Sequence, residues 1–166
     1  MQNRRRFLLS GGALAAFAAV THWRALAAAP AAPAETFEVT HTDAQWHQLL
    51  APPQYDVLRE AGTERPFTSP LNDEHRTGIF ACAGCQLDAY SSRTKFDSHT
   101  GWPSFWAPLP HAVSTQQDLS LGMARNEVHC RRCGSHLGHV FDDGPKPTGL
   151  RYCMNGLALS FRPGAA

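Results

Sequence analysis

Two pairs of cysteines are the strongest constraint on how this chain can fold. They are Cys82 with Cys85 and Cys130 with Cys133, and 44 residues separate the pairs. A Cys-x2-Cys turn directs two thiolates at one point, and two such turns complete the four-sulfur shell of a structural zinc site. The sequence therefore predicts one zinc ion held by all four cysteines. Because protein would fill every ligand position, we expect a structural metal rather than a Lewis acid.

Other uses of these cysteines are less consistent with the pattern. Two local disulfides would close very short loops and stabilise little. A thiol oxidoreductase acting through the first pair remains an alternative, although no βαβ pattern surrounds it. His136 and His139 follow the second pair at intervals of three. A shell built from them would leave the first pair without a role, so we assign no metal to the histidines.

The first 29 residues have the pattern of an export signal. Arg4-Arg5-Arg6-Phe7-Leu8 opens an apolar run at 7–20, which is too short to span a membrane. Small residues at 25–29 offer cleavage sites. The Arg-Arg-x-Phe-Leu order resembles a twin-arginine signal. We therefore expect export by the twin-arginine machinery to the periplasm or otherwise out of the cytoplasm, with no stable membrane span.

The rest of the chain has the size of one domain. A Pro- and Ala-rich linker at 30–36 precedes a predicted domain at 37–166. Removing residues 1–29 takes away four arginines and no acid, which leaves 11 basic and 14 acidic residues and a net charge of −3. Nucleic-acid binding needs a clustered positive surface, so the charge argues against such a partner.

The start of the domain predicts two short helices. Thr42 can cap the first helix, with Gln45 completing a capping box. The residues of its expected apolar face are Trp46, Leu49 and Leu50. The second helix is expected at 53–61, where proline begins it and Gly62 stops it.

Short apolar runs broken by turn residues replace the helical pattern from residue 77 onward. They predict strands at 78–81, 113–116, 127–130, 137–141, 150–154 and 157–161. Helices followed by closely spaced strands are typical of an α+β domain that is mainly β. We expect an antiparallel sheet or a partly closed, barrel-like core.

The fifth cysteine, Cys153, lies in one of these predicted strands. A lone cysteine there is often an inert buried side chain. Arg151 and the two histidines could instead favour its thiolate, which would make it reactive. The aromatic segment at 101–106 is equally open, since it suits either a corner of the core or a binding surface.

Several motifs together resemble the methionine-R-sulfoxide reductase (MsrB) family. They are Lys-Phe-Asp-Ser at 95–98, Gly-Trp-Pro-Ser-Phe at 101–105, the run at 130–141 and Arg-Tyr-Cys-Met-Asn at 151–155. The match extends in order from about residue 46 to residue 161. It implies two antiparallel sheets, a structural zinc and no organic cofactor. It also implies reduction of the R epimer of methionine sulfoxide, mainly in oxidised proteins.

The resemblance assigns roles to individual residues. Cys153 would attack the sulfoxide sulfur and become a sulfenic acid. His139 and His136 would orient and protonate the sulfoxide oxygen. Asn155 would help to hold the substrate by hydrogen bonds. The residues that would wall the methyl pocket are Trp102 and Phe105.

One position departs from the family pattern. Many members carry a resolving cysteine directly before Gly-Trp-Pro, and this chain has Thr100 there. We therefore expect a one-cysteine enzyme, whose sulfenic acid is reduced by a thioredoxin-like protein or another thiol, in the repair of exported proteins. The alternative is a zinc-ribbon-type binding module without catalysis, in which aromatic residues at 102–106 form the recognition surface.

Overall fold

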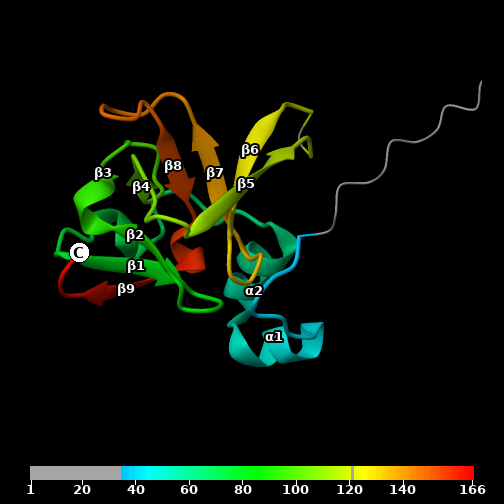
Figure 1. The fold of residues 1–166 in the computed structure, drawn as a ribbon. Coiled ribbons are helices and arrows are strands. Elements are labelled where there is room, and N and C mark those ends of the chain that lie inside the picture. Colours follow the sequence, from blue (N-terminus) through cyan, green and yellow to red (C-terminus); the bar gives the residue numbers. More distant parts are fainter. Residues whose placement is uncertain (1–34, 121) are drawn as a thin grey trace, which may run out of the picture. The chain divides into compact units, whose positions relative to one another are not determined.

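A computed structural model describes residues 35–120 and 122–166 (Figure 1). The predicted export signal and most of the predicted linker lie outside the described residues, so both remain predictions. Within the described ranges, no helix has the length and hydropathy that crossing a membrane would require.

Two short helices open the described part of the chain. Helix α1 is Asp43–Leu49, and the capping box between Thr42 and Gln45 is present, as predicted. Trp46 is buried as expected, but 59% of Leu49 is exposed, so the expected apolar face is wrong at that position. The helix has only seven residues and packs through one narrow stripe, which Leu49 does not reach.

Helix α2, Pro52–Glu60, begins one residue earlier than predicted. It ends where Ala61 adopts the left-handed conformation, with φ of 53°. The residue that ends the helix is therefore Ala61, one residue before the expected Gly62. Arg59 of this helix stacks its guanidinium over the Trp46 ring at 4.8 Å and so holds the two helices together.

The strands form two antiparallel sheets. The smaller has the order β2-β1-β9, from Asp88–Ser91, Gly78–Cys82 and Leu159–Pro163. The larger has the order β3-β4-β8-β7-β6-β5, from Lys95–Phe96, Ser104–Phe105, Arg151–Met154, His136–Phe141, Arg125–Cys130 and Val113–Asp118. The mainly β, two-sheet expectation is confirmed. The partly closed barrel is not, because β3 and β5 are edge strands.

Apart from shifts of one or two residues at strand ends, the strand predictions differ from the structure in two respects. The run at 157–161 begins instead with a 3-10 turn, Gly156–Ala158, and β9 starts only at Leu159. Strands β2, β3 and β4 were not predicted, because two to four residues are too few to show an alternating pattern.

The two sheets meet in an aromatic core. Phe105 of β4 is fully buried, stacks on Tyr90 of β2 at 4.4 Å and contacts Phe80 of β1 edge-on at 5.0 Å. Met154 of β8 points into this core and accepts a hydrogen bond from the Tyr90 hydroxyl. Since side chains alternate along a strand, Cys153 must face the other side of the sheet.

Candidate active site

Cys153 lies on the outer face of the larger sheet, between two neighbouring strands. It is directly opposite His139 of β7 on one side and Ser104 of β4 on the other. Directly opposed residues of antiparallel strands project from the same face. The sheet register therefore places an imidazole beside the thiol although 13 residues separate them in sequence.

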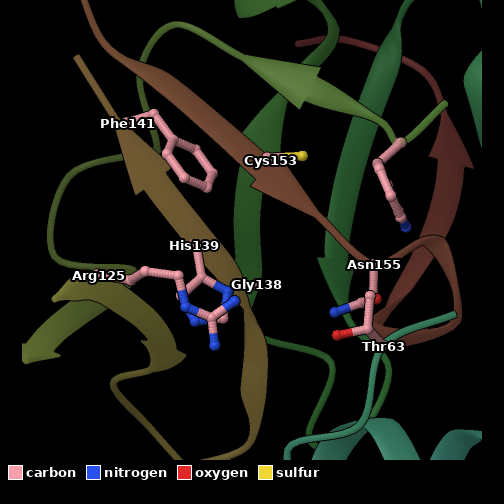
Figure 2. A pocket seen from close by; sticks show the side chains of 8 residues that line it. Thr63, Arg125, Gly138, His139, Phe141, Cys153 and Asn155 are labelled. Atoms are coloured by element: carbon pink, nitrogen blue, oxygen red, sulfur yellow. The ribbon is translucent and has the colours of Figure 1, made fainter. Parts of the chain in front are cut away.

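Cys153 opens into a pocket of about 140 Å³ (Figure 2). Figure 2 shows His139 and Phe141 projecting from β7 beside the Cys153 strand, with Thr63 and Asn155 grouped together. The residues that line the pocket are Thr63, Trp102, Arg125, Gly138, His139, Phe141, Cys153 and Asn155. Two aromatic side chains, a thiol, an imidazole and a guanidinium thus share one small cavity.

Glu64 holds two of these lining residues in place. Its backbone N–H donates to the Asn155 side-chain oxygen over 3.0 Å, and its carbonyl accepts the Trp102 indole N–H over 3.1 Å. Its buried carboxylate accepts backbone N–H groups of Gly156 and Leu157. One residue therefore fixes both an aromatic wall and an amide of the pocket.

Asn155 is almost completely buried, and its side-chain amide makes two hydrogen bonds to the protein. The oxygen accepts from Glu64, and the nitrogen donates to the Leu137 carbonyl over 3.3 Å. An amide nitrogen carries two hydrogens, so one N–H remains to donate toward the pocket.

His139 is oriented by a shared carboxylate. Its Nε2 and the Arg125 guanidinium both bond the same oxygen of Asp118, at 2.8 Å and 2.6 Å. Hydrogen bonds from Ser120, and then from His139, hold the pKa of Asp118 well below its usual range. Burial lowers the pKa of His139, and the hydrogen bond to Asp118 only partly opposes this. A neutral His139 with its proton on Nε2 leaves Nδ1 free to exchange a proton.

His136 lies next to His139 but is buried, and it is not among the pocket-lining residues. The two rings are 5.4 Å apart, edge to face. The Nδ1 atom of His136 bonds Glu127 over 2.7 Å, and that contact is the main reason why the pKa of Glu127 is lowered. Its Nε2 has no hydrogen-bond partner among the described residues.

The environment of Cys153 favours the protonated thiol. Burial raises its pKa, while the Thr100 hydroxyl, 3.9 Å from the sulfur, and the charge of Arg151 act in the opposite direction. Arg151 is itself held by two 2.8 Å hydrogen bonds to Asp143, and it lies over the Phe141 ring at 4.5 Å. The resting thiol therefore has a fixed cation nearby that would stabilise a thiolate when one forms.

Gly138 allows the two central strands to meet at the pocket. A Cβ atom at this position would overlap the carbonyl oxygen of Cys153 and press on the Met154 backbone. Only glycine therefore lets β7 and β8 approach closely enough to set His139 beside Cys153.

The structure groups most of the residues predicted from sequence. Cys153, His139, Asn155 and Trp102 share one cavity, and His136 contacts it only through the neighbouring ring. Phe105 is fully buried in the core and does not line the cavity.

The cavity also contains residues for which sequence reasoning gave no role. They are Thr63, Arg125, Gly138 and Phe141, with Asp118 and Glu64 behind them. Gly138 and Phe141 lie within the motif at 130–141. The others lie in segments without a recognisable pattern, so only the fold could bring them to the site.

The four remaining cysteines converge as predicted. The sulfurs of Cys82, Cys85, Cys130 and Cys133 all lie within 4.8 Å of one another. The nearest pairs are 3.5 Å and 3.8 Å apart, too long for a disulfide bond, and none of the four cysteines is in a disulfide. The cluster leaves no isolated dithiol at the first pair, which argues against a disulfide-exchange site there.

This cluster fits a tetrahedral metal. Ligand bonds of about 2.3 Å place the sulfurs of a zinc–thiolate tetrahedron about 3.8 Å apart. Cys82 ends β1 of the smaller sheet and Cys130 ends β6 of the larger one. A metal held here would therefore connect the two sheets, with no open position for substrate, and none of the four cysteines lines the Cys153 pocket.

Comparisons with known proteins agree with this geometry. The model of the SelR domain matches residues 50–163. A peptide methionine sulfoxide reductase MsrB from Leifsonia xyli subsp. xyli is 52% identical over 129 residues, covering 76% of this chain and 93% of its own. The MsrB of Thiobacillus denitrificans is 56% identical over 123 residues, covering 74% of this chain and 93% of its own. This chain therefore belongs to the MsrB family of peptide methionine sulfoxide reductases, which are oxidoreductases.

Proposed function

We propose that this chain reduces methionine-R-sulfoxide, mainly within oxidised proteins, to methionine through a sulfenic acid on Cys153. The observation that carries this proposal is the pairing of Cys153 with His139 inside a pocket walled by Trp102 and Phe141. A sulfoxide offers an electrophilic sulfur, a basic oxygen and a methyl group. The pocket offers a nucleophile, a proton-exchanging imidazole and aromatic walls.

The reaction uses the residues of the pocket in a fixed order. The Cys153 sulfur attacks the sulfoxide sulfur while the oxygen takes up a proton by way of His139. The oxygen then passes to Cys153, which becomes Cys–SOH, and methionine leaves. The cysteine sulfur is oxidised by two electrons and the substrate sulfur is reduced by two.

The sequence of this chain supports a one-cysteine cycle. Thr100 stands at the one position where the family pattern places a resolving cysteine, with its hydroxyl 3.9 Å from the Cys153 sulfur, and the other four cysteines converge elsewhere. Two external thiols would therefore return Cys–SOH to the thiol, forming one disulfide and one water. A thioredoxin-like protein or a small thiol suits this step.

We assign zinc to the four-cysteine cluster, because four thiolates in a tetrahedral arrangement are its preferred structural shell. Cys82, Cys85, Cys130 and Cys133 would hold it. There the ion would connect the two sheets through its coordination bonds and would take no part in the reaction.

We further propose that the chain is exported by the twin-arginine route and acts on periplasmic proteins. The support is the Arg4-Arg5-Arg6-Phe7-Leu8 order before a short apolar run. Replacing Arg4 and Arg5 by lysine in the full chain should retain the protein in the cytoplasm. Unchanged periplasmic recovery of the variant would overturn the twin-arginine assignment.

The reaction is tested with the purified protein, dithiothreitol and the separate R and S epimers of a methionine sulfoxide derivative. We expect loss of the R epimer only, and none with Cys153→Ser. A chemical probe for sulfenic acid should label Cys153 after one turnover without thiol. Failure to consume the R epimer, or full activity of Cys153→Ser, would overturn the proposal.

A further inference from the structure

A second cavity adjoins the active-site pocket. It has a volume of about 420 Å³ and shares Trp102 with the smaller pocket around Cys153. Trp102 is therefore a wall common to both. We call the larger cavity the Phe67 groove, and the reaction described above does not use it.

Phe67 lines this groove with an exposed aromatic ring in an unusual backbone conformation. The residue is 72% exposed, and its φ of 63° is in the left-handed region. That region costs a non-glycine residue about 1–2 kcal/mol. A large apolar side chain that is both exposed and held at such a cost points to a binding role.

The floor of the groove is held rigidly beneath this ring. The Phe67 N–H donates to the Gly101 carbonyl over 2.8 Å, and the Asn72 side chain donates to the same oxygen over 2.8 Å. The Lys95 ammonium in turn donates to the Asn72 carbonyl over 2.7 Å. A Cβ at Gly101 would press on Phe67, so the ring lies directly against the residue that precedes Trp102.

The length of a methionine side chain sets where the rest of a substrate must lie. With its sulfur at Cys153, the substrate backbone is only roughly 5 Å away, at the rim of the pocket. Each further residue of an extended chain covers about 3.3 Å. Because Trp102 borders both cavities, two or three flanking residues that run toward it would enter the space beside Phe67.

We propose that the Phe67 groove binds the polypeptide segment next to the oxidised methionine of a protein substrate, with an apolar side chain packed against the Phe67 ring. This inference rests on the proposed reductase function. The groove also contains acidic and basic side chains, including Asp97 and His99, so it does not select a strongly charged segment. The groove makes the enzyme favour peptide-bound sulfoxide over a single modified residue.

The test compares two substrates in the full chain with dithiothreitol as the reductant. One is the R-sulfoxide of N-acetyl-methionine amide, and the other is a heptapeptide with a central methionine-R-sulfoxide flanked by leucines. Phe67→Asn removes the ring while asparagine tolerates the left-handed backbone. Phe67→Gly, which is unstrained there, is the second variant. Leu49→Gln on α1 is the matched control, since Leu49 is similarly exposed but lines neither cavity.

Both Phe67 variants should lower kcat/KM for the heptapeptide about five- to tenfold, mainly through KM, and leave the single-residue substrate unchanged. Leu49→Gln should change neither. Equal effects on the two substrates, or no effect on either, would overturn the proposed role of the Phe67 groove in binding the peptide. A loss that appears only when a thioredoxin replaces dithiothreitol would also overturn it, because the groove would then hold the reductant. A wild-type chain inert toward both substrates would instead refute the reductase function itself.

Discussion

The Thr100 hydroxyl oxygen lies 3.9 Å from the sulfur of Cys153. A thiol at that position would need only a small side-chain rotation to reach the disulfide distance of about 2.05 Å. Thr100→Cys should therefore form an intramolecular disulfide after one turnover. Counting free thiols after stoichiometric sulfoxide treatment should show two lost, against one oxidised sulfur in the wild type.

His99→Cys is the matched control for this experiment. It adds the same thiol one residue away, on a side chain that is 87% exposed. Its thiol count should fall by one only. Equal losses in the two variants would show that proximity to Cys153 does not determine the outcome.

The reactivity of Cys153 should rise only at alkaline pH. Burial raises its pKa, so the thiol rather than the thiolate dominates at neutral pH. Iodoacetamide alkylation of Cys153 should follow an apparent pKa above the ordinary value of about 8.5. Arg151→Met removes the nearby positive charge and should raise that pKa further, whereas Asp143→Asn leaves the charge in place and should have a smaller effect. An apparent pKa below the ordinary value would contradict this account.

Asp118 should support the protonated form of His139. Burial lowers the pKa of His139, so its imidazolium loses its proton at a pH below the ordinary pKa of about 6.5. The bond to Asp118 opposes that shift, and Asp118→Asn should therefore lower the pKa further and reduce kcat at neutral pH. Histidine NMR titration checks the first effect and turnover the second. Asp142→Asn, at an exposed acid three residues after His139 in the sequence, should change neither.

Loss of the four-cysteine cluster should loosen the contact between the sheets. Cys130→Ser should lose the bound metal and much of its stability, because binding energy at a structural zinc site is also folding energy. Metal analysis should find one zinc per chain in the wild type and in Cys153→Ser. Thermal unfolding should show a large drop in Tm for Cys130→Ser only. Retention of zinc and Tm in that variant would refute the cluster as a structural site.

Glu64 should stabilise the fold and the pocket together. Glu64→Gln replaces a carboxylate oxygen that accepts a buried backbone N–H by an amide donor, which should cost about 1–3 kcal/mol of unfolding free energy. Because the Gly156 turn directly follows Asn155, KM for the sulfoxide should also rise. Denaturant unfolding and steady-state kinetics measure the two effects. Glu60→Gln, an exposed acid at the end of α2, should leave both unchanged.

The sequence by itself determined the features that depend on local spacing. The two Cys-x2-Cys turns predicted the metal cluster, and the Thr42–Gln45 box predicted the start of α1. Apolar runs located most of the strands of five or six residues. Motif resemblance identified Cys153 and His139, which do share the pocket. In each case a few adjacent residues carry the whole signal.

Only the tertiary structure decided which distant residues meet. Phe105 belongs to the core because strand alternation and the contact with Tyr90 turn it inward, away from the pocket. Asp118 and Glu64 reach the site through sheet register and a loop crossing, and neither leaves a local pattern. Long-range pairing depends on how whole strands align and bury their apolar faces, so no short segment of sequence records it.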